Sequence, residues 1–154
     1  MATLESQVAN SVSNSAANTA EAEAAVQLAE SALASLSARD TASLRGMFHE
    51  SGRLVSLSDD PATPARVTQL EQFLSGLGEE GPVLLERMWD PTVHVDGRLA
   101  TVWTPYDFYR DGEFSHCGID VFQLARVDER WQILSITYTV HRDGCAESPL
   151  GRPS

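Results

Sequence analysis

Apolar residues recur at helical spacing early in the chain. From Glu21 onward they repeat every three or four positions, which is the pattern of an amphipathic helix with one buried stripe. Residues 1–20 are rich in Ser, Asn and Ala and offer little to bury, so we expect a disordered arm or a frayed extension of this helix. The stripe comprises Ala25, Leu28, Ala29, Ala32, Leu33 and Leu36.

Two further helices are predicted before the pattern changes. Asp40 is placed to cap a short second helix, which Gly52 is expected to end. A short strand over residues 53–57 and a loop follow. Apolar spacing then predicts a third helix over residues 67–77, ending at Gly78.

The second half of the chain reads as long strands separated by tight turns. The turn signals are Asp96-Gly97, Asp111-Gly112 and, more weakly, Asp128-Glu129. Strands of this length curl because of their twist, and a curled sheet buries its hollow side under helices. The pattern therefore predicts three helices packed into a strongly curved antiparallel sheet, an α+β cone. The four strands are expected over residues 83–95, 98–110, 113–127 and 130–142.

Two-residue turns fix the register of these strands. Val95 would pair with Arg98, Arg110 with Glu113, and Val127 with Arg130. One β-bulge would exchange the two faces beyond it. The predicted hollow face carries Trp89, Val102, Thr104, Tyr106, Phe108, Cys117, Ile119, Val121, Gln123, Leu134, Ile136, Tyr138 and Val140. The predicted outer face carries Asp90, Trp103, Asp107, Tyr109, His116, Asp120, Phe122, Thr137, Thr139 and His141.

The length and net charge of the chain limit the number of domains and the kinds of partner it can bind. The 154 residues fit one domain, here residues 21–143 between the arm and a tail over 144–154. The net charge is -11 and all eleven basic residues are Arg, so no basic patch indicates binding to nucleic acid or to an anionic membrane. No apolar run is long enough to span a membrane, and residues 1–20 lack the features of a secretion signal. We expect a cytoplasmic protein, in which Cys117 and Cys145 would be free thiols rather than a disulfide.

Several segments resemble the nuclear transport factor 2-like superfamily, which includes ketosteroid isomerases, SnoaL-like polyketide cyclases and limonene epoxide hydrolases. The likeness covers roughly residues 22–142 and includes a bacterial branch of unassigned function. It implies a cone-shaped, cystatin-like roll with a ligand site in its hollow. The segments are ARDTASL at 38–44, MFHE at 47–50, GRLV at 52–55 and RVDERWQI at 126–133, with Trp103, the stretch 116–120 and Tyr138.

The resemblance does not carry over the best-known activities of that superfamily. The isomerase base would fall near Ser56, its tyrosine near Ala32 and its second acid near Gln123, and none of these side chains supplies the required group. The epoxide hydrolases need an Asp-Arg-Asp cluster, whereas Arg87 and Asp90 point to opposite faces of one strand. Steroid isomerisation is therefore disfavoured.

The candidate catalytic side chains lie on the predicted outer face of the sheet. His116 would lie opposite Asp107 with Asp120 beside it, which is either a general-base arrangement or a polar surface pair. With His141 opposite His116, a zinc or iron site is a weaker alternative, and our prediction is no metal and no cofactor.

Two classes of function remain open. The first is a small-molecule binding protein or enzyme of SnoaL-like type, with acid–base chemistry such as isomerisation, cyclisation or dehydration on a small apolar or aromatic ligand. The second is a non-catalytic association module, a homodimer held through Trp103 and Tyr109 of the outer face. The expected catalytic residues are His116, Asp120 and Asp107, and the expected ligand wall is Trp89, Tyr106, Phe108, Cys117, Gln123 and Tyr138.

Overall fold

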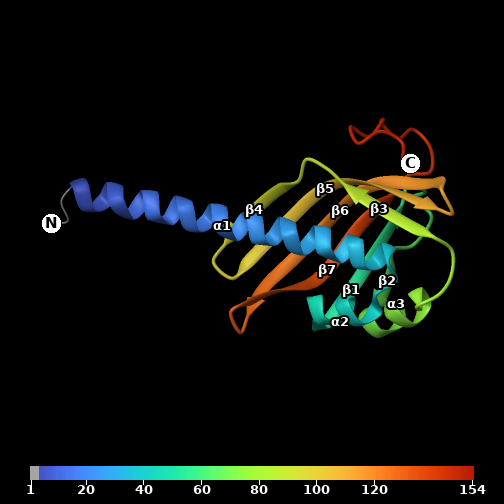
Figure 1. Ribbon diagram of the computed structural model, residues 1–154, viewed down its shortest axis with the longest axis horizontal. Coiled ribbons are helices and arrows are strands. Elements are labelled where there is room, and N and C mark those ends of the chain that lie inside the picture. The colour runs from blue at the N-terminus through green and yellow to red at the C-terminus, as the bar shows by residue number, and fades with distance from the viewer. Residues whose placement is uncertain (1–3) are drawn as a thin grey trace.

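The structure of the protein is a computed structural model that describes residues 4–154, with side chains described from residue 18 onward. Helices precede a sheet built mainly from the second half of the chain (Figure 1). The helices are α1 (Leu4–Ser37), α2 (Thr41–Met47) and α3 (Leu70–Leu77). The strands are β1 (Phe48–Ser58), β2 (Arg66–Gln69), β3 (Leu84–Met88), β4 (Thr92–Asp96), β5 (Leu99–Arg110), β6 (Glu113–Val127) and β7 (Arg130–Val140).

The described strands form one curved sheet in the order β2-β1-β7-β6-β5-β3, and β4 also pairs with β5. All neighbouring pairs are antiparallel except β1 and β7, which run parallel. The α+β class is therefore as predicted, but the sheet is mixed rather than purely antiparallel. The parallel pair arises because β1 comes from the helical half of the chain and joins the edge of the meander.

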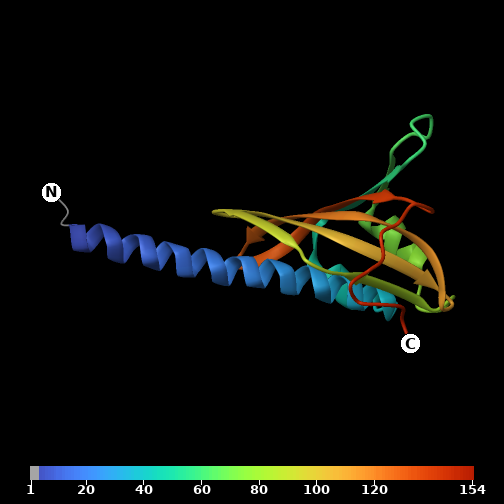
Figure 2. The ribbon, with the colours of Figure 1, turned by 90° about the horizontal axis from the view of Figure 1, so that it is seen from above.

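The three helices cover one side of the sheet. α1 crosses it and projects well beyond it at the N-terminal end (Figures 1 and 2). Its predicted stripe is confirmed: Ala25, Ala29 and Ala32 are at most 1% exposed. Small side chains on this stripe let the helix backbone approach the strands closely. The core beneath includes Leu44, Leu54, Val102, Phe122, Leu124 and Ile133.

Several predicted boundaries were wrong for local reasons. The second helix ends at Met47, and Gly52 lies inside β1 where the pairing with β7 is irregular. Residues 66–69 pair with β1 before α3 begins, so the third helix is shorter than its apolar spacing predicted. The predicted strand 83–95 is broken between β3 and β4, where Asp90 adopts a φ of 43° and Pro91 has no backbone N–H to donate.

Two of the predicted turns are confirmed with their register. Asp111 and Gly112 both have positive φ, and Arg110 pairs with Glu113 across them. The β6–β7 turn is also a two-residue turn with positive φ at both positions. The third differs: Asp96 still pairs, with Leu99, so its turn lies one residue later than predicted.

A bulge at Ser115 decides which side chains of β6 face the helices. Tyr109 pairs with Phe114 as predicted, but Phe108 pairs with His116, so one extra residue lies in β6. Every side chain of β6 beyond this point is therefore on the opposite face from the predicted one. A second irregularity lies at Leu134 in β7. Beyond it, the side chains of β7 again point to the faces that were predicted for them.

Cys117 and Cys145 form a disulfide, so the prediction of free thiols was wrong. The spacing of the two residues gave no sign of this pairing. It is the bulge in β6 that turns Cys117 toward the outer face, where the C-terminal tail passes. α1 begins at Leu4, and the division into arm, domain and tail stays a prediction. Among the described residues, no helix is both long and apolar enough to cross a membrane.

Candidate functional site

The hollow of the sheet holds a small pocket of about 200 Å³ between α1, α3 and the strands. Leucines from both helices close it on one side, and strands β3, β5, β6 and β7 supply the other walls. Most of the lining is apolar, with polar groups concentrated on the sheet side. The described lining residues are Leu33, Leu36, Leu54, Phe73, Leu77, Leu84, Glu86, Phe108, His116, Asp120, Ile136 and Tyr138.

Two carboxyl groups lie together in this pocket. Asp120 of β6 is 1% exposed, and no hydrogen-bond donor among the described residues reaches its Oδ2 atom. Its partner is Glu86 of β3, whose carboxyl is within hydrogen-bonding reach. Glu86 points inward because it alternates with Leu84 and Met88, which also face the helices. Two acids sharing one apolar pocket must also share a proton.

Burial raises the pKa of both acids. The pKa of Glu86 rises from 4.5 to about 7, against a lowering by its hydrogen bond with Asp120, while the charge of Asp107 adds to the rise. Burial, followed by the charge of Glu86 and the hydrogen bond to it, raises the pKa of Asp120 well above 3.8. Both carboxyl groups therefore hold their protons at higher pH than exposed acids do.

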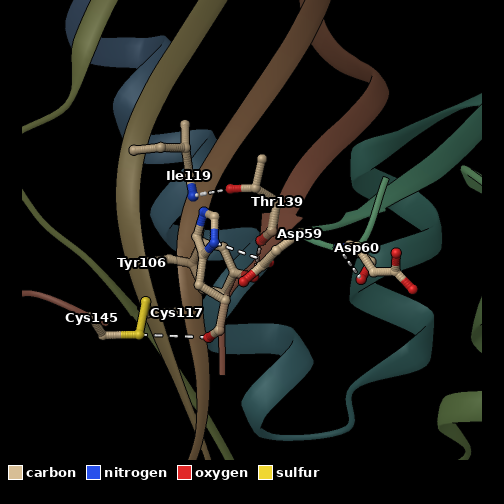
Figure 3. A network of polar contacts seen from close by, with 9 residues as sticks. Asp59, Asp60, Tyr106, Cys117, Ile119, Thr139 and Cys145 are labelled. Atoms are coloured by element: carbon tan, nitrogen blue, oxygen red, sulfur yellow. Dashed lines mark hydrogen bonds and ion pairs between the residues drawn. A yellow bond between two sulfur atoms is a disulfide. The ribbon is translucent and has the colours of Figure 1, made fainter. Parts of the chain in front are cut away.

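Two tyrosines flank the acids. Tyr106 is 1% exposed, and its hydroxyl donates a 2.6 Å hydrogen bond to the carbonyl oxygen of Thr139 (Figure 3). Tyr106 pairs across the sheet with Gly118, where an added Cβ would lie 2.2 Å from that same carbonyl oxygen. Tyr138 lines the pocket itself, and burial raises its pKa although a hydrogen bond with Ser56 lowers it. Both hydroxyls stay protonated at neutral pH.

His116 lies inside the pocket and not on the outer face as predicted. Its ring stacks on Phe108 with centroids 4.8 Å apart and meets the edge of Tyr106 at 5.8 Å. Burial and, to a smaller extent, Arg142 lower its pKa from 6.5 to about 4. Its Nδ1 atom is 2.9 Å from the hydroxyl oxygen of Ser115. His116 is therefore a neutral ring at neutral pH, able to accept or donate one hydrogen bond.

Asp107 does not join His116 and Asp120. It lies on the opposite face in a two-pronged ion pair with Arg87, at 2.9 and 2.6 Å, and is 4% exposed. The C-terminal tail covers this pair, and Arg87 also donates to the carbonyl oxygen of Gly151. The predicted trio is thus divided by the sheet, since the bulge moves His116 and Asp120 inward and leaves Asp107 outside.

Three residues of the predicted ligand wall lie elsewhere. Cys117 is on the outer face in its disulfide with Cys145 (Figure 3). Gln123 is exposed. Trp89 lies in the link between β3 and β4 and is not among the described pocket residues. Tyr106, Phe108 and Tyr138 do face the hollow as expected. Their role toward a ligand stays a prediction.

The weaker alternative of a metal site does not assemble among the described residues. His141 forms an ion pair with Asp59 at 3.0 Å, away from His116 in the pocket. No group of three or more His, Cys, Asp or Glu side chains in the described part of the chain is arranged to hold a metal ion.

The predicted association residues lie on the outer face. Trp103 is 53% exposed, and the Tyr109 ring packs against Phe114 with the Arg87 guanidinium 5.4 Å from its centroid. Sequence reasoning missed Glu86 altogether. One signal for a buried acid was available in the sequence. Glu86 lies between Leu84 and Met88 at every second position of a strand that was expected to have one buried face.

No protein-family model matches this sequence, and no curated protein matches it. Solved structures match over most of the chain. A nuclear transport factor 2-like protein with a cystatin-like fold from Novosphingobium aromaticivorans has a TM-score of 0.66 at 15% identity, covering 95% of this chain and 94% of that one. The chain has the nuclear transport factor 2-like fold.

Other solved structures match comparably. One of unknown function from Shewanella baltica has a TM-score of 0.63 at 14% identity, covering 81% of this chain and 97% of that one. The association domain of C. elegans CaMKII has a TM-score of 0.63 at 16% identity, covering 79% and 97% of the respective chains. At such identities the likeness concerns the fold alone. The pocket must therefore be interpreted from its own residues.

Proposed function

We propose that this protein binds a small, mostly apolar molecule in the hollow of its sheet and transfers protons to or from it through Asp120 and Glu86. The observation that carries the proposal is the Asp120 carboxyl, 1% exposed in an apolar pocket without a hydrogen-bond donor to Oδ2 among the described residues. A buried acid in this state is costly to the fold, and such groups concentrate at functional sites.

The roles of the two acids follow from their pKa values. Asp120, whose pKa burial raises well above its ordinary value, holds a proton and donates a hydrogen bond or the proton itself to an oxygen or nitrogen of the ligand. Glu86, with its pKa near 7, accepts a proton from the ligand. The neutral ring of His116 and the Tyr138 hydroxyl offer further hydrogen bonds that orient the ligand. Isomerisation, cyclisation and dehydration all need such a donor and acceptor pair.

A fragment screen by protein NMR tests whether the pocket is a ligand site. We expect small single-ring compounds to shift the backbone amide signals of residues 116–120 and 84–88. Leu77→Trp, which fills the pocket rim, should abolish these shifts, whereas Leu99→Trp at an exposed position, 45% accessible, should retain them. A diverse single-ring library that leaves these signals unmoved would show that the pocket is only a packing defect.

A second candidate function is association between copies of the chain. Trp103 is a large apolar side chain, 53% exposed on the sheet face opposite the helices, and a fold relative is an association domain. Native mass spectrometry of the purified protein should give a dimer of the 16.8 kDa chain, and Trp103→Ala should shift it toward monomer. A dimer that persists unchanged in Trp103→Ala would remove this residue from the interface.

The expected cytoplasmic location stays a prediction. The Cys117–Cys145 disulfide favours an oxidising compartment over that location.

A further inference from the structure

The charge of the pocket is not balanced by its own lining. Above pH 7 the Glu86 carboxyl, whose pKa is about 7, is mostly ionised and places a negative charge at the wall. None of the described lining residues is Lys or Arg, and the one His is uncharged. The ionised groups that shift the pKa of these two acids are themselves acids, Asp107 on Glu86 and Glu86 on Asp120. A buried negative charge without a cation favours a cationic ligand.

The aromatic rings that line the pocket are compatible with a cationic ligand. Phe108, Phe73 and Tyr138 all line it, and the faces of aromatic rings carry the negative part of their quadrupole. Two arginines act on other groups of the pocket from outside the described lining: Arg142 affects His116 and Tyr106, and Arg66 affects Tyr138. Neither is among the groups that shift the pKa of the two acids.

The size of the pocket limits the ligand to one ring or its equivalent. A buried apolar cavity of about 150 Å³ holds benzene. The pocket here, at about 200 Å³, therefore fits one ring with a short arm. The acids lie on the sheet side and the leucines on the helix side, so a ring would contact the helices while its arm reaches the carboxyl groups.

We propose that the ligand of this pocket is a small organic amine in its ammonium form, whose nitrogen binds between the carboxyl groups of Glu86 and Asp120 while its apolar part packs under α1 and α3. This assignment rests on the proposed function and adds the chemical class of the ligand. The Oδ2 atom of Asp120 would gain the hydrogen-bond donor it lacks among the described residues, and an ammonium group has three donors to share between the two acids.

Three probes of equal size and different charge test the assignment on the full chain. Benzylamine, benzyl alcohol and benzoate are titrated at pH 7.5, and binding is measured by calorimetry and by the amide shifts of residues 116–120. We expect benzylamine to bind at least tenfold more tightly than benzyl alcohol, and benzoate to give no shift. Asp120→Asn should reduce benzylamine affinity at least fivefold, while Asp128→Asn in the exposed β6–β7 turn should leave it unchanged.

The outcomes separate the two proposals. Benzyl alcohol binding as tightly as benzylamine would overturn the cationic ligand and leave the pocket standing as a site. Shifts caused by benzoate would also overturn it. If none of the three probes shifts the pocket amides, the amine assignment is wrong, and the wider fragment screen with Leu77→Trp decides the proposed function separately. The comparison of the three probes on the wild-type protein tests the assignment even if a variant folds poorly.

Discussion

The carboxyl groups of Asp120 on β6 and Glu86 on β3 meet in one pocket, although strand β5 lies between their strands. Two residues far apart in the chain thus become one titrating pair. Tyr106 and Tyr138 flank the two acids and supply no positive charge. This pair should contribute to the response of the fold to pH from about 4.5 upward.

The contribution of this acid pair to stability should fall as pH rises from about 4.5 to about 7. In the unfolded chain Glu86 ionises near its ordinary pKa of 4.5, whereas in the folded chain its pKa is about 7 and that of Asp120 is raised well above 3.8. The folded state binds more protons, so its stability is lost as pH rises through these values, by up to about 1.4 kcal/mol per pH unit for each proton held. Urea unfolding at several pH values measures the slope.

Removal of one acid should flatten that slope. Asp120→Asn keeps the shape and removes the ionisable group, so the part of this pH dependence that Asp120 contributes should disappear and stability at pH 8.5 should rise. Asp128→Asn removes a charge at an exposed turn and should keep the wild-type slope. An unchanged slope in Asp120→Asn would mean that the pair does not hold the proton.

His116 should act in the opposite direction at lower pH. Its pKa falls from 6.5 to about 4 on folding, so the neutral ring contributes stability that is present above pH 6.5 and lost as pH falls toward 4. NMR titration of the ring protons reports this pKa directly. A value near 6.5 would place the ring in water and not against Phe108.

Gly118→Ala should destabilise the fold by about 1–3 kcal/mol, because overpacking forces the backbone apart. The new Cβ would lie 2.2 Å from the carbonyl oxygen of Thr139, which also accepts the Tyr106 hydroxyl. Gly46→Ala in α2 is the matched control: nothing lies within 4 Å of its added Cβ, so stability should be equal or higher. Thermal unfolding of both variants decides whether β6 needs a glycine here.

The buried ion pair beneath the C-terminal tail should matter more than an exposed one. Arg87→Met leaves Asp107 charged and 4% exposed, which should cost about 3–5 kcal/mol. Arg45→Met breaks the pair with Glu71, whose side chains are 53% and 71% exposed, and should cost about 1 kcal/mol or less. Equal losses in denaturant unfolding would show that the tail does not exclude water from Arg87.

Reduction of the disulfide should weaken the fold by roughly 3–4 kcal/mol, as expected for closing a loop of this length. The bond joins residues separated by 28 positions and fixes the tail to β6. Cys145→Ser should show the same loss with or without reductant, while the wild type should show it only with reductant. Identical unfolding of oxidised and reduced wild type would mean that the tail is held by its other contacts.

The sequence by itself determined the local elements. Apolar spacing identified the helices, and the Asp-Gly turn at residues 111–112 fixed the β5–β6 register at its start, because turn geometry and side-chain period are properties of neighbouring residues. It also placed Tyr106, Phe108 and Tyr138 on the hollow face. These features depend on short stretches of chain, in which each residue contacts those beside it.

Only the tertiary structure decided which polar groups meet. The single extra residue at Ser115 exchanges the faces of β6, which brings His116 and Asp120 inward, leaves Asp107 outside and directs Cys117 to its disulfide. The approach of Glu86 to Asp120 depends on the order of β3, β5 and β6 in the sheet. Side chains alternate with a period of two, so one inserted residue inverts every later position, and no local spacing in the sequence records such an insertion.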